Sequence, residues 1–352
     1  MSQSKKQYLN YIHYFRGFAI LVIVGIHCRI SLNWGDNALG KQVFTTALDN
    51  GTILFVFIAG FLFQYLKEKF EYRSYLIRKI RFVVLPYLII SALPIILKML
   101  ELHHSSWIPP DMIPDNPFLK GLFYITTGKH LGPFWFIPMI VIFYIISPLF
   151  IKIDKPWFYK WVFPPLMVAS LFTFKFGFFS NVWASFIHFF PVYIFGMWAA
   201  NNKDRLTGMP INTLVVLIVI YLGLSVIEIA GLLPAPRVGS FEEDELMPFF
   251  AFNIVKLRVY LLCLILFKVF YLFDDKQLPL LRFLGDYSFG IYFIHIFIIK
   301  AIQWIVLYID PDFTLNFVTF LIYVGLVSVV TIFVVKVTKT IFGDKSRMII
   351  GS

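Results

Sequence analysis

The chain has 352 residues, of which 59% are apolar and only 14% are charged, whereas a soluble domain usually has about a quarter charged residues. This much apolar surface needs the lipid bilayer as a second apolar solvent, which excludes a soluble globular protein. The net charge of +11 does not indicate nucleic-acid binding, because the basic residues cluster at alternate ends of hydrophobic runs and form no basic arm.

The hydrophobic runs, taken in chain order, are each long enough to cross a membrane, since a helical span needs about 20 mostly apolar residues. They cover residues 11–31, 47–66, 82–100, 134–151, 157–174, 181–200, 211–232, 255–273, 287–308 and 315–336. Pro164 and Pro165 weaken the fifth run, and Lys256 and Arg258 weaken the eighth. The first run is too long for a signal-peptide core and has no cleavage site, so we expect it to be retained. The sequence predicts an all-α, polytopic transmembrane bundle of about ten spans.

The charges between the runs predict how the bundle is oriented. The even-numbered connections and the C-terminal tail carry the basic residues Lys67, Lys69, Arg73, Arg78, Lys79, Arg81, Lys152, Lys155, Lys203, Arg205, Lys276, Arg282, Lys336, Lys339, Lys345 and Arg347. The odd-numbered connections carry the acidic residues Asp36, Asp111, Asp115, Glu242, Glu243, Asp244, Glu245, Asp310 and Asp312. Because Lys and Arg bias short loops toward the cytoplasm, we expect both termini to be cytoplasmic.

One connection stands out, the long loop 101–133 that this orientation places outside. Its prolines disfavour a regular helix, and a loop of this length usually has a function. Residues 1–352 are otherwise expected to form a single membrane-embedded domain with no appended soluble domain.

Ionisable residues within a span are costly and are therefore candidates for function. The first span holds Arg16 and His27, whose spacing places them on one helix face about 16 Å apart along the axis. Histidine suits general-base chemistry near neutral pH. The same spacing also fits an arginine that reaches the headgroups and a histidine bonded within the core. The spacing alone does not decide between these hypotheses.

Further candidates lie along the rest of the chain. Arg78 and Arg81 are neighbours on one helical turn and could bind a phosphate or carboxylate, although a purely topological role fits them too. His295 lies within the ninth span and Glu228 near the outer end of the seventh, whereas His188, among phenylalanines, has the surroundings of a structural residue.

Several common site motifs are absent from the sequence. No HExxH or CxxC spacing predicts a metal site, and Cys28 and Cys263 are too few for a disulfide or zinc framework. The GxSxG, Walker and GxGxxG patterns are also missing, which removes the commonest hydrolase and nucleotide-binding hypotheses.

Five segments resemble, in the same order, the motifs of the acyltransferase-3 family of multi-pass membrane acyltransferases. They are FRGFAILVIVGIH with Arg16 and His27, GTILFVFIAGFL at 51–62, RKIR at 78–81, GPFWFIPMIVIFYIISP at 132–148, and LGDYSFGIYFIHIFII at 284–299. The resemblance runs over most of the chain. Ala59 stands where the family's second helix commonly has a small hydroxyl residue, so we assign no role there.

This resemblance implies an enzyme of the inner or plasma membrane, an O-acyltransferase that transfers groups other than amino-acyl groups. It would move an acetyl or related acyl group from cytoplasmic acyl-CoA, most simply acetyl-CoA, to a hydroxyl of an exopolysaccharide, another surface polysaccharide or a glycolipid. The implied partners are the lipid bilayer, the surface glycan or lipid-linked sugar, and other glycan-assembly proteins. No metal and no nucleic acid is expected.

The resemblance also implies roles for particular residues. His27 would take the proton of the acceptor hydroxyl or carry the acyl group itself, with Arg16 on the same face, while Arg78 and Arg81 would bind the phosphates of coenzyme A. The residues expected near the glycan are Trp107, Trp135, His295 and Glu228.

Three alternatives stay open at this point. The acyl group could be succinyl or another group in place of acetyl. A glycan transporter or flippase without acyl chemistry would also suit a polytopic bundle with intramembrane Arg, His and Glu, but it predicts an inverted repeat, which the sequence does not show. Some family members carry an esterase-like C-terminal domain, so this chain is expected to finish the transfer unaided or to pass the acyl group to a separate partner.

Overall fold

The structure is a computed structural model that describes residues 9–49, 51–100, 108–173, 181–232 and 252–352. Helices dominate these ranges, and no β-strand is found within them. The helices are α1 (Asn10–Ser31), α2 (Ala38–Leu48), α3 (Gly51–Tyr65), α4 (Tyr72–Lys79), α5 (Leu85–Met99), α6 (Pro117–Thr127), α7 (Phe136–Ile145), α8 (Ser147–Ile153), α9 (Phe163–Ser170), α10 (Val182–Asn201), α11 (Lys203–Thr207), α12 (Ile211–Ile229), α13 (Ile254–Leu272), α14 (Pro279–Asp286), α15 (Ser288–Ile309), α16 (Phe317–Phe342) and α17 (Ser346–Ile349). The all-α, polytopic prediction is confirmed.

Seven helical stretches within the described ranges are long and apolar enough to cross a membrane, and an eighth is added if the pair bent by 74° at residues 117–145 counts as one span. All ten predicted runs are helical, but the fifth consists of a π-helical turn, Phe158–Val162, and the short helix α9. Helix α13 carries three basic side chains, Lys256, Arg258 and Lys268. The number ten and the cytoplasmic termini therefore stay predictions.

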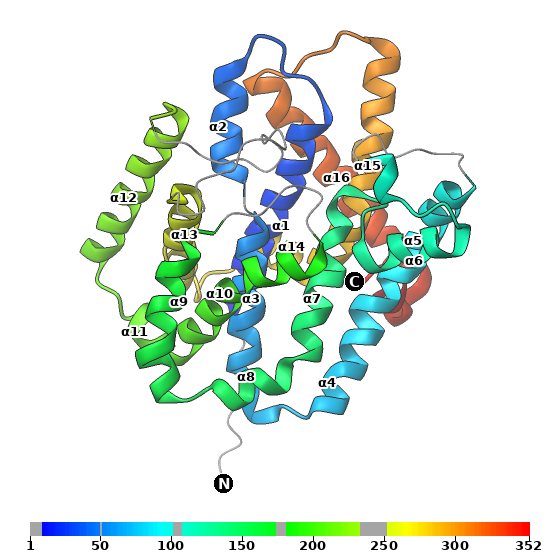
Figure 1. Ribbon diagram of the computed structural model, residues 1–352. Helices are drawn as coiled ribbons and strands as arrows, with labels where there is room; N and C mark the ends of the chain where they lie inside the picture. Colours follow the sequence, from blue (N-terminus) through cyan, green and yellow to red (C-terminus); the bar gives the residue numbers. More distant parts are fainter. Residues whose placement is uncertain (1–8, 50, 101–107, 174–180, 233–251) are drawn as a thin grey trace.

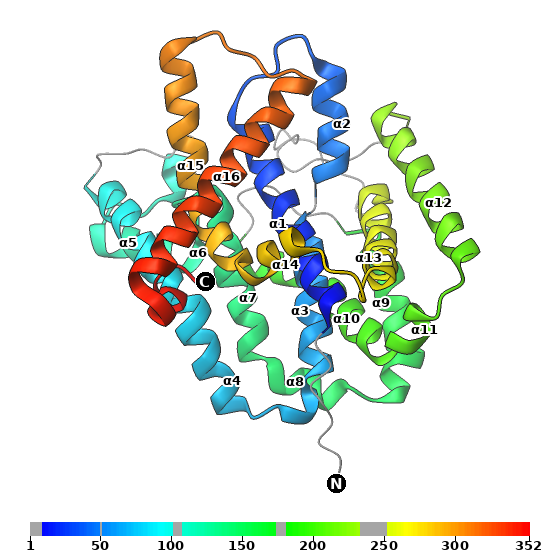
Figure 2. The same cartoon turned by 180° about the vertical axis from the view of Figure 1, so that it is seen from behind.

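Helix α1 lies at the centre of the bundle, where α2, α3, α13, α14, α15 and α16 contact it (Figures 1 and 2). Most of its residues are buried, in contrast to α12 at the edge, which buries only Leu214 and Glu228. A largely apolar helix with so little burial is suited to face lipid. The side chains of α1 consequently face other helices, and its polar residues lie inside the protein.

Two pairs of helices pack with their backbones in contact. A Cβ atom on Gly60 of α3 would collide with the Tyr193 carbonyl of α10, and one on Gly196 would collide with the Phe57 carbonyl. Gly17 of α1 and Gly285 of α14 form a similar pair, against the carbonyls of Leu281 and His13. Small residues permit such close approach between membrane helices. The second pair fixes α14 across the first turns of α1.

Wide π-helical turns at Ile80–Val84 and Phe158–Val162 each come directly before a proline-containing turn, at Pro86 and at Pro164–Pro165. Proline cannot donate a backbone hydrogen bond and crowds the preceding turn, which a wider turn accommodates. The first of these turns lets α4 and α5 continue as one helical stretch, Tyr72–Met99, so that Arg78 and Arg81 lie on the same stretch as the third predicted span.

The loop predicted at 101–133 contains a helix, α6, in its described part. Pro117 occupies the first turn of this helix, where a missing backbone N–H removes no helical hydrogen bond. The Asn116 side chain accepts hydrogen bonds from the N–H groups of Phe118 and Leu119, and Gly128, with φ +69°, ends the helix. The expectation that proline would keep this segment irregular was therefore wrong, because the proline sits at the position that tolerates it.

Candidate functional site

One end of the candidate site lies at Arg16, in the N-terminal half of α1. Its Nη2 atom lies 2.8 Å from the hydroxyl of Ser288, the first residue of α15, which is buried. The close packing of Gly17 against α14 brings the start of α15 beside α1, because α14 ends at Asp286, two residues before Ser288. An arginine in the first span is thereby joined to a residue 272 positions away in the sequence.

The other end of the candidate site is a pair of imidazoles, His27 of α1 and His295 of α15. The ring centroids of His27 and His295 lie 5.2 Å apart, with an angle of 41° between the ring planes. Arg16 and His27 thus both contact α15, at Ser288 and His295, as expected for two residues on one face of α1. The two helices run in the same direction over this stretch, since the order of the contacts is the same on both.

The hydrogen bonding of His295 fixes which of its nitrogens carries the proton. Its Nδ1 lies 3.0 Å from the Ile291 carbonyl oxygen, which can only accept, so we assign the hydrogen to Nδ1. Nε2 then presents a lone pair. This atom is buried and has no hydrogen-bond partner in the described part of the chain. An acceptor in this state is suited to a hydroxyl or N–H donor that comes from outside the protein.

Tyr292 of α15 links the 132–136 segment to His295. The Tyr292 hydroxyl donates to the Pro133 carbonyl at 2.6 Å, and its ring stacks on Phe134 at 6.1 Å. Tyr292 also contacts the His295 ring at 6.1 Å. Trp135 stacks on Phe189 of α10 at 5.8 Å. The GPFW segment is therefore joined to His295 through Tyr292, although it lies far from His295 in the sequence.

Basic residues gather at the Arg16 end. The Lys79 ammonium lies over the rings of Tyr75 and Tyr144, at 5.2 and 4.7 Å, and the charges of Arg16, Arg78 and Arg347 act on it. The guanidinium groups of Arg81 and Arg347 share the ring of Phe82, at 5.5 and 4.3 Å. We call Arg16, Arg78, Lys79, Arg81 and Arg347 the basic cluster. Arg78 and Arg81 are exposed, so a solvent-borne anion can reach them.

Ser288, Lys79 and Arg347 belong to this site but were not predicted. Ser288 and Lys79 stand within motifs that the sequence displays, LGDYSFGIYFIH and RKIR, so those motifs held the signal. Arg347 had none, because its approach to Phe82 depends on how the chain after α16 folds back.

The remaining candidates lie elsewhere. Glu228 forms an ion pair with Arg258 at 2.9 Å, and its other oxygen accepts from Thr46 at 3.0 Å. Both charged side chains are buried, so this pair links α12 to α13 and α2. Trp107 and the acidic run at 242–245 lie outside the described residues. No group of three or more His, Cys, Asp or Glu that could hold a metal ion is found in the ranges that the structure covers.

Comparison with known proteins adds one match. A family model described as an acyltransferase domain matches residues 9–336. That range contains both helices of the imidazole pair and all of the basic cluster except Arg347. No curated protein and no solved structure matches the chain.

Proposed function

Because the chain belongs to the acyltransferase-3 family over nearly its whole length, we propose that it moves an acyl group from acyl-CoA, bound at the basic cluster, to an acceptor hydroxyl at the imidazole pair. The family makes it a multi-pass membrane acyltransferase. The observation that supports this particular reaction best is the contact between the rings of His27 and His295 in the interior of the bundle.

An acceptor hydroxyl is a weak nucleophile until a base removes its proton. In the proposed step, the acceptor oxygen bonds to the acyl carbonyl carbon and the hydroxyl proton passes to His27. The carbon–sulfur bond to coenzyme A then breaks, and the proton is passed to the departing thiolate. A covalent acyl-histidine at His27 would reach the same product in two steps, but direct transfer needs fewer.

Acyl-CoA is proposed as the donor because of two exposed arginines and the axial distance from Arg16 to His27. Arginine side chains bind phosphates through paired hydrogen bonds, and Arg78 and Arg81 are exposed at the end of the bundle that holds Arg16. From Arg16 to His27 the helix rises about 16 Å, which is comparable with an extended pantetheine arm. Acetyl-CoA is the simplest donor, and succinyl-CoA is the rival.

The acceptor is proposed to come from the end of the bundle opposite to the basic cluster. The positive-inside rule predicts that the basic cluster faces the cytoplasm, where acyl-CoA is made, and that the opposite end of α1 faces the cell surface. A polysaccharide or glycolipid exported across the plasma membrane would meet the site from that end. A transporter without acyl chemistry would give no reason for the match to an acyltransferase domain.

Mass spectrometry of surface glycans tests the proposal. Glycans from a strain that lacks this chain should be lighter than those of the parent by one or more acyl groups, and the mass difference identifies acetyl or succinyl. Reintroducing the unchanged chain should restore the mass, and reintroducing the His27→Gln chain should not. Identical glycan masses in the deletion and parent strains would refute the proposed function.

A further inference from the structure

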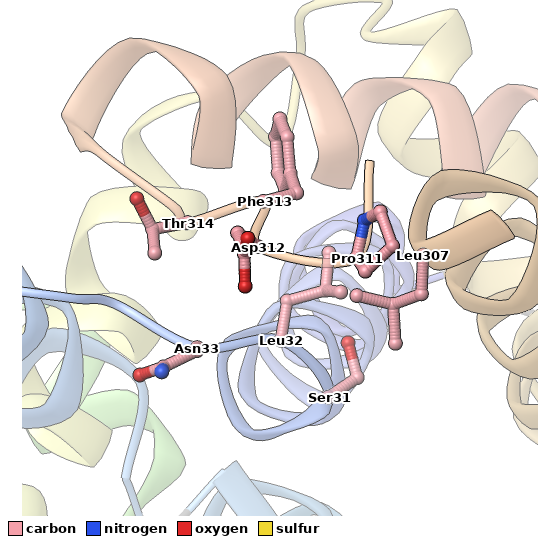
Figure 3. Close-up of a pocket in the computed structure, with 8 residues that line it drawn as sticks. All are labelled: Ser31, Leu32, Asn33, Leu307, Pro311, Asp312, Phe313 and Thr314. Carbon is pink, nitrogen blue, oxygen red and sulfur yellow. The ribbon is translucent and has the colours of Figure 1, made fainter. Parts of the chain in front are cut away.

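A small hollow lies where α1 ends and the chain passes from α15 to α16 (Figure 3). Its volume is about 400 Å³, and its lining residues are Ser31, Leu32, Asn33, Leu307, Pro311, Asp312, Phe313 and Thr314. This volume falls within the range of roughly 300–1,000 Å³ that is usual for small-molecule sites. None of these residues was a candidate from the sequence.

Hydrogen bonds hold the walls of the hollow in place. The Leu315 N–H donates to the Asn33 carbonyl at 2.7 Å, which joins the α15–α16 connection to the end of α1. The Gln303 amide donates to the Ser31 carbonyl, and the hydroxyls of Ser31 and Tyr323 lie 3.0 Å apart. The hollow is therefore formed before any ligand arrives, as is usual for small-molecule sites.

The hollow is lined by both polar and apolar side chains. In Figure 3, Asn33, Asp312 and Thr314 lie on one side with the Phe313 ring, while Leu32, Leu307 and Pro311 lie on the other side with the Ser31 hydroxyl. The Asp312 carboxylate, the Thr314 hydroxyl and the Asn33 side-chain nitrogen make no hydrogen bond to other described residues, whereas the Asn33 side-chain oxygen accepts from Trp34 and Gly35. Donors and acceptors are thus available beside an apolar wall, which suits a sugar ring with its hydroxyl rim and C–H face.

The hollow also lies on the correct side of the imidazole pair. Ser31 comes four residues after His27, so it lies on nearly the same face of α1 and about 6 Å farther along the axis. Arg16 and the basic cluster lie toward the other end of the helix. A ligand in the hollow would approach His27 from the end opposite to the proposed donor.

The charge of the lining limits which sugar fits. Asp312 is the one charged residue among those that line the hollow, and no lining residue is basic. A carboxylate on the ligand would therefore meet a like charge with no cation to offset it.

We infer that this hollow, between the end of α1 and the α15–α16 connection, binds an uncharged sugar unit of the acceptor and rejects an acidic one. The inference rests on the proposed function for the identity of the acceptor, but the hollow's chemistry predicts sugar binding whether or not acyl transfer occurs.

Saturation-transfer NMR on the purified, detergent-solubilised chain without acyl-CoA tests the inference, with methyl glucoside as the neutral probe and methyl glucuronide as the acidic probe. The glucoside should bind, and the glucuronide should bind at least tenfold more weakly. Asp312→Asn removes the charge and keeps the shape, so it should narrow this difference to about threefold or less.

Two further variants test the hydrogen bonds to the sugar. Asn33→Ala and Thr314→Val should each weaken glucoside binding by about two- to tenfold, the usual effect of one lost uncharged hydrogen bond. Asp36→Asn is the control. Asp36 is exposed and lies, like Asn33, between α1 and α2, but it does not line the hollow. Thermal unfolding of each variant shows whether it is folded.

The outcomes separate this inference from the proposed function. Glucoside binding that depends on Asn33 and Thr314, in a chain that transfers no acyl group, would refute the proposed function and leave the hollow as a sugar site. Equal binding of both probes, no glucoside binding, or equal effects of the lining variants and Asp36→Asn would overturn the inference, whatever the transfer assay gives.

Discussion

His295 has its Nδ1 hydrogen committed to the Ile291 carbonyl, so its other nitrogen can only accept. Beside it lies the half-buried residue His27, whose ring contacts that of His295. The sequence predicted that Arg16 and His27 share a face, because 100° per residue brings position 27 back over position 16. It could not predict that α15 lies opposite, since that contact joins segments more than 260 residues apart.

At His27, replacement by glutamine is expected to lower kcat by about 10²- to 10⁴-fold with little change in acyl-CoA affinity. Glutamine keeps polarity and approximate reach but cannot accept a proton at neutral pH. Steady-state kinetics together with acyl-CoA binding on the purified chain measure this. A variant that keeps more than about a tenth of the wild-type rate would remove His27 from the role of base.

Two replacements of His295 test the roles of Nδ1 and Nε2 separately. In His295→Asn the amide nitrogen can still donate to Ile291, but nothing replaces Nε2, so kcat is expected to fall at least tenfold while the melting temperature changes little. His295→Gln places a polar group near Nε2 and should restore part of the rate only if hydrogen bonding, rather than proton uptake, is what His295 supplies.

His130→Asn is the matched control for these variants. His130 is also buried, has its Nδ1 3.2 Å from the Tyr124 carbonyl, and has an Nε2 without a partner in the described part of the chain, but its neighbours are aromatic rings and not His27. Equal losses of rate in His130→Asn and His295→Asn would show a general packing effect and not a role in the reaction.

In the basic cluster, replacing Arg78 and Arg81 together by alanine should raise the dissociation constant of acyl-CoA tenfold or more. Hydrogen bonds to charged groups contribute about 1.5–3 kcal/mol each, and both side chains are exposed, so water screens part of this. Lysine at both positions should rescue binding only partly. Arg73→Ala on the same helix is the control, and an equal loss there would indicate a non-specific effect of charge.

At the scale of the helices, the hydrophobic runs predicted where helices form. Every predicted run is helical, because apolar backbone in a bilayer must satisfy its hydrogen bonds internally. The sequence pattern did not reveal α6, because the sequence alone does not distinguish a proline in the first turn of a helix from one that interrupts it. Nor did it reveal the backbone contacts at glycines, which depend on two helices that are distant in sequence.

The glycine contact between α1 and α14 yields a prediction at this scale. Gly285→Ala places a methyl group against the His13 carbonyl, and neither backbone can move without shifting α14. We expect a loss of about 1–3 kcal/mol in stability and reduced transfer, because Ser288 would be displaced from Arg16. Gly223→Ala on α12, where a Cβ atom would meet no heavy atom within 4 Å, should be neutral or slightly stabilising. Thermal unfolding in detergent compares the two, and equal melting temperatures would contradict the packing argument.

At the scale of the whole molecule, the orientation of the bundle decides whether the basic cluster can meet acyl-CoA. Impermeant thiol labelling of intact cells should modify Asp111→Cys in the segment before α6 and leave Asn202→Cys, between α10 and α11, unmodified until the membrane is opened. The native Cys28 and Cys263 are buried, so they should contribute little background. The reverse pattern would place Arg78 and Arg81 outside and would contradict the proposed donor site.

The parallel course of α1 and α15 has a consequence for how the protein could be inhibited. Two contacts, Arg16 with Ser288 and His27 with His295, each join one residue of α1 to one residue of α15. A slide of α15 by one turn, about 5.4 Å, would therefore break both contacts at once. A compound bound between Arg16 and Ser288 would therefore separate the two imidazoles from a distance, without competing with an acceptor at the imidazole pair.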